Sequence, residues 1–300
     1  NLGMTPCTPI SNASYSKGSW HVKGSGGMLM MKDALAYSKN PVAVRLIEAA
    51  GAKNVIQLAR DLGVTEEMKD NLTIALGSSD ITIYEMLGAY STFANYGNYI
   101  KPEMIWRIED ANGRVIKEIK PNIREVMNPM HAYSMIYMMK GVAAYGTASS
   151  ELKRMGINAE IAGKTGTTDN NSDGWFIGIT PKLATGVWVG WEDRATHFWS
   201  TGEGQGARMA LPIWGYFMKK IYADKSLGIS PKDTFEKPSD WTGNCSDLQG
   251  LGGYGDEGGL RTIDEIRNPK QPSNNNGQNE NKNENINDKI NRTEDIDFNQ

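Results

Sequence analysis

The segments "AEIAGKTGTT" (159–168), "GWFIGIT" (174–180) and "LATGVWVGW" (183–191) decide the fold class. Each is short and rich in Val, Ile, Trp or Thr, which favour strands, and turn-forming residues separate one segment from the next. Neighbouring strands joined by such short links run antiparallel. The sequence therefore predicts a three-stranded antiparallel meander between residues 159 and 191.

Helical segments flank this meander on both sides. Downstream, "ALPIWGYFMKKIYAD" (210–224) is suited to cover one face of the sheet, whereas residues 1–27 are predicted to be a loop. Residues 102–119 are predicted to be a hairpin that turns at Asn112-Gly113. Helices followed by an antiparallel meander and a last helix indicate an α+β fold. The upstream segments with helical spacing of apolar residues are 28–37, 42–51, 52–63, 82–97 and 131–144.

Composition excludes several classes of function. The chain has 300 residues, a formal net charge of -3 and no run of Lys or Arg, which argues against a nucleic-acid or anionic-membrane surface. The three histidines show no metal-ligand spacing, so we expect no metal and no cofactor. Cys7 and Cys245 are too few and too separated for a disulfide framework, and they leave the redox compartment undecided.

The chain is expected to divide into three parts. Residues 1–225 contain all the predicted helices and strands and form one domain. Residues 226–267 have no assignment and are expected to be an extension of unknown role. Residues 268–300 are rich in Asn, Glu and Lys and have one aromatic residue, so they cannot bury enough apolar surface to offset their ordering entropy, and we expect disorder there.

Lys164, Thr165, Gly166 and Thr167 form a candidate anion site. The two threonines lie two residues apart, so on a strand their hydroxyls project to one side, next to the lysine ammonium. This group suits a carboxylate. Gly166 has no side chain, so a second extended chain has room to add to this strand edge. The Thr167 N–H would then stabilise negative charge on a carbonyl oxygen.

Ser38 and Asn40 are the second candidate pair, and two interpretations are open. They precede a predicted helix that begins near Pro41, so one interpretation is a helix N-cap, a common use of both residue types. The other is that they belong to a site with Lys164. The motifs S-x-x-K, S-x-N and K-T-G together are a signature of penicillin-binding proteins and serine β-lactamases, and this favours the second interpretation.

Six sequence segments, in the same order as in the family, strengthen this resemblance. The chain closely resembles the transpeptidase domain of bifunctional (class A) penicillin-binding proteins over about residues 18–220. The resemblance implies an antiparallel sheet covered by helices, with a helical subdomain. The blocks are "DALAYSKNPVAVRL", "ALGSSDITIYEMLGAYSTFANYG", "YGTA", "GKTGTT", "DGWFIGITPKLATGVWVGWED" and "GQGARMALPIWGYFM".

The resemblance also implies an activity. In this family an active serine attacks the D-Ala–D-Ala bond of a peptidoglycan stem peptide and passes the acyl group to an amine, and β-lactams mimic that peptide. On this pattern Ser38 and Lys164 form a proton relay, and Asn40 donates its amide to a substrate carbonyl. Thr165 and Thr167 hold the terminal carboxylate, and the Thr167 N–H is half of the oxyanion hole.

The reacting serine itself is not identified among these blocks. Ser14-Tyr15-Ser16-Lys17 fits S-x-x-K, but it leads into glycines and no helix follows, so we expect Ser14 in a loop. Ser150 and Lys153 also fit, but they follow the S-x-N motif instead of preceding it. We therefore expect the nucleophile upstream of Asn1, in an N-terminally incomplete domain that is inactive alone.

The parent protein implied by the resemblance acts outside the cytoplasm. It would be anchored in the bacterial cell membrane through an upstream segment, on the periplasmic side, and would also carry a glycosyltransferase domain. Its expected partners are stem peptides and β-lactams, and no nucleic acid. Two alternatives remain: a serine β-lactamase, for which no deacylating base is identified, and a non-catalytic module that senses β-lactams or peptidoglycan.

Overall fold

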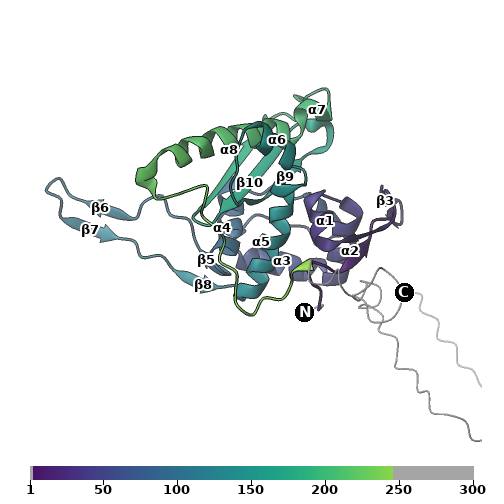
Figure 1. Cartoon of the computed structure of the whole chain (residues 1–300), viewed down its shortest axis with the longest axis horizontal. Helices are drawn as coiled ribbons and strands as arrows, with labels where there is room; N and C mark the ends of the chain where they lie inside the picture. Colours follow the sequence, from purple (N-terminus) through teal and green to yellow (C-terminus); the bar gives the residue numbers. More distant parts are fainter. Residues whose placement is uncertain (1–2, 246–300) are drawn as a thin grey trace, which may run out of the picture. The chain divides into compact units, whose positions relative to one another are not determined.

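The computed structural model describes residues 3–245 (Figure 1). The chain divides into two units, Asn1–Asn268 and Pro269–Gln300. The predicted disordered tail, residues 268–300, and most of the predicted extension, residues 226–267, lie outside the described residues.

A three-stranded antiparallel sheet forms the centre of the first unit. Its strands are β9 (Ala162–Thr167), β10 (Gly174–Thr180) and β11 (Leu183–Val189), in the order β11-β10-β9. Both pairings are antiparallel, so the predicted meander is confirmed. Because β10 is the central strand, β9 is an edge strand, and within residues 3–245 its one partner is β10. The strand that carries the candidate anion site therefore has one free edge.

Side chains of β10 alternate between two helical layers, as expected for a strand buried on both faces. Phe176 packs against Trp214 of α8 (Gly206–Ala223), with ring centroids 5.1 Å apart. Ile179 packs on the opposite face with Met139 of α5 (Pro129–Ala144). Figure 1 shows α8 along one side of the sheet. The helices therefore cover both faces of the sheet, and the chain has the predicted α+β fold.

The helix starts follow from local chemistry. Thr82 accepts a hydrogen bond from the backbone N–H of Glu85, whose carboxylate reaches back to Thr82, and this capping box begins α4 (Ile83–Ala94). The Asn128 side chain caps α5 by accepting from the backbone N–H groups of Met130 and His131, ahead of a proline at the first helical position. The other helical elements are α1 (Met31–Ala36), α2 (Asn40–Ala50), α3 (Ala52–Asp61), α6 (Ser149–Arg154), α7 (Thr201–Gly204), η1 (Leu72–Leu76), η2 (Asp169–Asn171) and η3 (Lys225–Leu227).

The prediction of a loop over residues 1–27 is wrong in part. Three short strands lie there, and residues predicted as the start of a helix form a fourth, so α1 begins three residues later than expected. Each strand has three residues, too few to show alternation of apolar and polar side chains. The strands are β1 (Pro9–Ser11), which pairs with β4 (Met28–Met30), and β2 (Tyr15–Lys17), which pairs with β3 (Trp20–Val22).

The predicted hairpin is confirmed. It consists of β6 (Arg107–Glu109) and β7 (Val115–Glu118), which pair antiparallel. The Asp110 carboxylate accepts from the backbone N–H groups of Asn112 and Arg114, both at 2.9 Å, and so stabilises the turn. A second pair that the sequence did not predict, β5 (Asn98–Ile100) with β8 (Ile123–Glu125), flanks the hairpin in the chain.

The chain after α8 returns along α5. Phe235 and Trp241 are buried there, and Trp241 contacts Tyr133 with ring centroids 5.0 Å apart. The Trp241 indole N–H also donates to the Ser134 hydroxyl at 2.8 Å. Residues 228–245 are therefore part of the folded unit.

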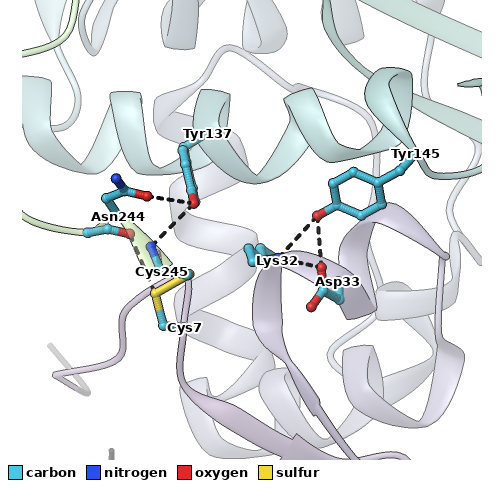
Figure 2. A network of polar contacts seen from close by, with 8 residues as sticks. Cys7, Lys32, Asp33, Tyr137, Tyr145, Asn244 and Cys245 are labelled. Atoms are coloured by element: carbon cyan, nitrogen blue, oxygen red, sulfur yellow. Dashed lines mark hydrogen bonds and ion pairs between the residues drawn. A yellow bond between two sulfur atoms is a disulfide. The ribbon is translucent and has the colours of Figure 1, made fainter. Parts of the chain in front are cut away.

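A disulfide joins Cys7 to Cys245, with Cα atoms 5.4 Å apart (Figure 2). The Cys245 backbone N–H also donates to the Tyr137 hydroxyl of α5 at 3.3 Å. The expectation that these cysteines are too separated to form a disulfide framework therefore overlooked this single bridge. Separation in sequence does not limit a disulfide, because the fold brings both ends of the domain to the same helix.

Removing the disulfide should destabilise the domain. Its two cysteines are 238 residues apart in sequence, and closing so long a loop restricts the unfolded chain strongly. We expect the Cys7→Ala/Cys245→Ala variant to lose about 2–5 kcal/mol of unfolding free energy in urea denaturation. As a control, dithiothreitol should destabilise the original chain and leave the variant unchanged. Equal stabilities with and without the bridge would contradict this.

Candidate active site

Ser38 lies in a tight turn between α1 and α2. Its backbone is left-handed, with φ 53°, a conformation that a residue with a Cβ adopts at a cost. The turn is held by the backbone N–H groups of Ser38 and Lys39, which donate to carbonyls of α1 at 3.1 and 2.9 Å. The N-cap of α2 is Lys39, without a side-chain cap hydrogen bond. The alternative interpretation of Ser38 and Asn40 as the helix cap is therefore wrong.

Lys164 on β9 reaches this turn from the sheet. Its Nζ donates to Ser38 Oγ at 2.9 Å and to the Thr165 carbonyl at 2.8 Å. Loss of solvent around the ammonium lowers the pKa of Lys164 to about 8. No carboxylate forms an ion pair with Lys164 in the described part of the chain to oppose this shift. A lysine with this pKa can accept and return a proton near neutral pH.

The two threonines of β9 are held by different partners. Thr165 Oγ1 lies 2.7 Å from Thr147 Oγ1, in the segment between α5 and α6. Thr167 Oγ1 accepts from the Gly206 backbone N–H at 3.0 Å, at the first residue of α8. The positive end of the α8 dipole therefore lies beside Thr167, where it favours an anion. The hydroxyls of both threonines are fixed in place before any ligand arrives.

The free edge of β9 presents the backbone of both threonines. The Thr168 N–H donates to the Asp173 carbonyl beside β10, at 3.2 Å. Because N–H groups alternate in direction along a strand, those of Thr165 and Thr167 point away from β10. They lie on the side of β9 where a further strand would pair.

Two glycines allow close packing at this place. A Cβ on Gly166 would lie 3.0 Å from Cβ of Trp175 on β10, so this glycine accommodates its neighbouring strand. A Cβ on Gly206 would collide with the Gly166 carbonyl oxygen. The missing side chains thus let the N-terminus of α8 approach Thr167.

Asn40 is less closely tied to this cluster. It is the first residue of α2 and is exposed, and it lines a shallow pocket with Ser38, Tyr37 and the chain at Gly24 and Ser25. Lys164 does not line that pocket. The structure therefore brings Ser38 and Lys164 into contact and places Asn40 at the adjacent turn.

Tyr145, the residue that caps the C-terminus of α5, supports the Ser38 turn and was not identified from the sequence. Its hydroxyl donates to Asp33 of α1 at 2.8 Å, and Lys32 donates to the same carboxylate at 2.6 Å (Figure 2). Its ring lies 5.9 Å from that of Tyr37, the neighbour of Ser38. Burial and the Asp33 carboxylate raise the pKa of Tyr145 to about 12, so it stays a hydrogen-bond donor. Thr147 was missed too, and only the "YGTA" block hinted at both.

Neither S-x-x-K match contacts this cluster. Ser14 Oγ accepts from the Gly24 N–H at 3.0 Å, and Lys17 forms an ion pair with Glu48 at 3.4 Å. Ser14 lies in the irregular segment immediately before β2, which confirms the prediction that it is in a loop. Ser150 and Lys153 lie on α6, both exposed.

The described residues offer neither a metal cluster nor a membrane-spanning helix. Between residues 3 and 245, no three His, Cys, Asp or Glu side chains gather in a way that suits a metal ion. Within the same residues, no helix has the length and hydropathy needed to cross a membrane.

Comparisons with known proteins identify the family. The family model described as "Penicillin binding protein transpeptidase domain" matches residues 5–195. The chain is 36% identical over 249 residues to penicillin-binding protein 1A of Aquifex aeolicus, and 34% identical over 237 residues to that of Neisseria lactamica. These matches cover 79% and 72% of this chain but 32% and 29% of the relatives, so the chain spans about a third of their length.

Solved structures support the same fold. A crystal structure of penicillin-binding protein 1A from Haemophilus influenzae matches with a TM-score of 0.67 and 23% identity, over 79% of this chain and 41% of that one. PonA1 from Mycobacterium tuberculosis, in complex with penicillin V, matches with a TM-score of 0.65 and 23% identity, over 81% of this chain and 69% of that one. The chain belongs to the family of penicillin-binding protein transpeptidase domains.

Proposed function

We propose that this chain supplies the substrate-binding and proton-relay part of a D,D-transpeptidase site in a peptidoglycan synthase. The contact of Lys164 Nζ with Ser38 Oγ at 2.9 Å, beside the free edge of β9, is the observation that carries this proposal. An extended stem peptide adds to β9 as a further strand. Its terminal carboxylate is bound by Thr165 and Thr167, next to the positive end of α8.

The chemistry is acyl transfer through a serine acyl-enzyme. The bond between the two D-Ala residues breaks as a serine oxygen attacks its carbonyl, and the Thr167 N–H donates to the oxygen on which charge develops. Ser38 and the partly neutral Lys164 carry the proton toward the departing D-Ala amine. Asn40 donates its amide to a substrate carbonyl. A β-lactam occupies the same position and stays as the acyl group.

The acylated serine is neither Ser14 nor Ser150. A nucleophile needs its hydroxyl within hydrogen-bond reach of the proton relay, and neither serine has a hydrogen bond to Lys164 or Ser38. We infer that the serine and the lysine of its S-x-x-K motif come from sequence outside this chain, and that the 300 residues alone do not form an acyl-enzyme.

The parent protein, in this proposal, works on the extracytoplasmic side of a bacterial membrane and also polymerises glycan strands. The Cys7–Cys245 disulfide supports an oxidising location, because disulfides are rare in the cytosol. The β-lactamase alternative has less support, because the relatives that the chain matches are penicillin-binding proteins.

Stem-peptide binding tests the substrate site without needing the nucleophile. A diacetyl-lysyl-D-alanyl-D-alanine peptide should shift the amide NMR signals of Thr165 and Thr167. The Thr165→Val variant lacks the hydroxyl that donates to the terminal carboxylate of the peptide. It should bind the peptide about tenfold more weakly, as expected for a lost hydrogen bond to a charged group. Thr185→Val, on the far strand β11 of the same sheet, is the matched control and should bind normally. Equal binding by both variants would contradict the proposed site.

Covalent labelling tests the assignment of the nucleophile. Incubated with a fluorescent penicillin, this chain should remain unlabelled on a denaturing gel, while a complete penicillin-binding protein labels under the same conditions. Stoichiometric labelling that disappears in the Ser14→Ala or Ser150→Ala variant would show that the reacting serine lies in this chain after all.

A further inference from the structure

The β6–β7 hairpin is an exposed sheet with two free edges. Its strands pair with each other and with no other strand of the described part of the chain, and Figure 1 shows the hairpin projecting away from the helices and the central sheet. Large apolar side chains along β6 are nevertheless exposed: Trp106 by 64% and Ile108 by 42%. An apolar, unpaired strand edge is a template for pairing with another chain.

The backbone of β6 fixes which residues are available on its free edge. The Trp106 carbonyl accepts from the Ile119 N–H at 2.8 Å, and the Asp110 N–H donates to the Arg114 carbonyl at 3.0 Å. Residues 106 and 110 therefore face β7. Because backbone direction alternates along a strand, the N–H and C=O groups of Arg107 and Glu109 face away from it.

We propose that a second copy of this chain pairs with β6 along this edge, antiparallel and about a twofold axis at Ile108. Arg107 of each copy then lies opposite Glu109 of the other, and each such pair exchanges two backbone hydrogen bonds. The two Ile108 side chains meet on the axis, in the closer, non-hydrogen-bonded position. Such an interface is isologous, so it closes as a dimer.

Charge complementarity selects this register. Centring the pairing on Arg107 or on Glu109 would place like charges directly opposite each other, which is destabilising. On the outer edge of β7, pairing centred on Lys117 would oppose two lysines in the same way. The hairpin has three basic side chains (Arg107, Arg114, Lys117) and three acidic ones (Glu109, Asp110, Glu118), so two hairpins carry no net repulsion.

Within one copy, Arg107 forms an ion pair with Glu109, two residues along the same face. Charged residues on an edge strand normally discourage pairing. Arg107 and Glu109 discourage pairing with most other strands. An antiparallel copy of β6 presents the same two charges in reverse order, so that each arginine lies opposite a glutamate. The edge therefore favours a second copy over an unrelated strand. This inference is independent of the proposed enzymatic function.

Cysteine cross-linking tests the position of the axis. The only two cysteines form the internal disulfide, so an introduced thiol is the only free one. Under mild oxidation the Ile108→Cys chain should form a covalent dimer, because residues at this position are close enough for a disulfide. Ile116→Cys, on β7 and 66% exposed, is the matched control and should remain monomeric. Equal cross-linking of both, or none of either, would overturn the proposal.

Charge reversal tests the register and the partner. In sedimentation velocity the original chain should dimerise with increasing concentration, and Arg107→Glu and Glu109→Arg should each lower the dimer fraction at least fivefold. Mixing these two variants should restore the dimer, because each then presents the opposite charges to the other. Dimerisation that survives each single change, failure of the mixture to associate, or a monomeric original chain would overturn the proposal.

Discussion

The hydrogen bond from Lys164 Nζ to Ser38 Oγ is the contact on which the candidate site depends. It joins the two parts of the domain, because Ser38 belongs to the helices at the start of the chain and Lys164 to the sheet. Its cost is twofold: a left-handed serine in the turn and an ammonium with little solvent. Strain and a displaced pKa together are common at functional sites.

The rest of the fold can be understood as holding these two groups in place. The Tyr145 hydroxyl and Lys32 both bond Asp33, which holds α1 and so the turn that follows it. On the sheet side, Thr147 and the N-terminus of α8 fix the threonine hydroxyls of β9. The disulfide and Trp241 then attach the two ends of the domain to α5. The candidate site is thus preorganised at several levels, as a precise binding site requires.

Sequence reasoning succeeded where a pattern extends over many residues. The meander, the Asn112-Gly113 hairpin and the helices with apolar periodicity were all predicted, since their signals repeat over two or more turns or strands. The three-residue strands near the N-terminus have no such repeat. The Cys7–Cys245 bridge and the contact of Thr147 with Thr165 depend on distant segments meeting, which spacing alone does not encode. The roles of Ser38 and Lys164 rested on resemblance, and their contact agrees with it.

The ionisation of Lys164 tests this account most directly. Reductive methylation with ¹³C-formaldehyde makes each lysine visible by NMR, and Lys164→Met identifies its signal. The account predicts that the Lys164 signal titrates at about pH 8, well below the value of about 10.4 for a lysine in a model peptide. A Lys164 that titrates at the model-peptide value would mean that its ammonium is solvated and away from Ser38, and would contradict the site as described.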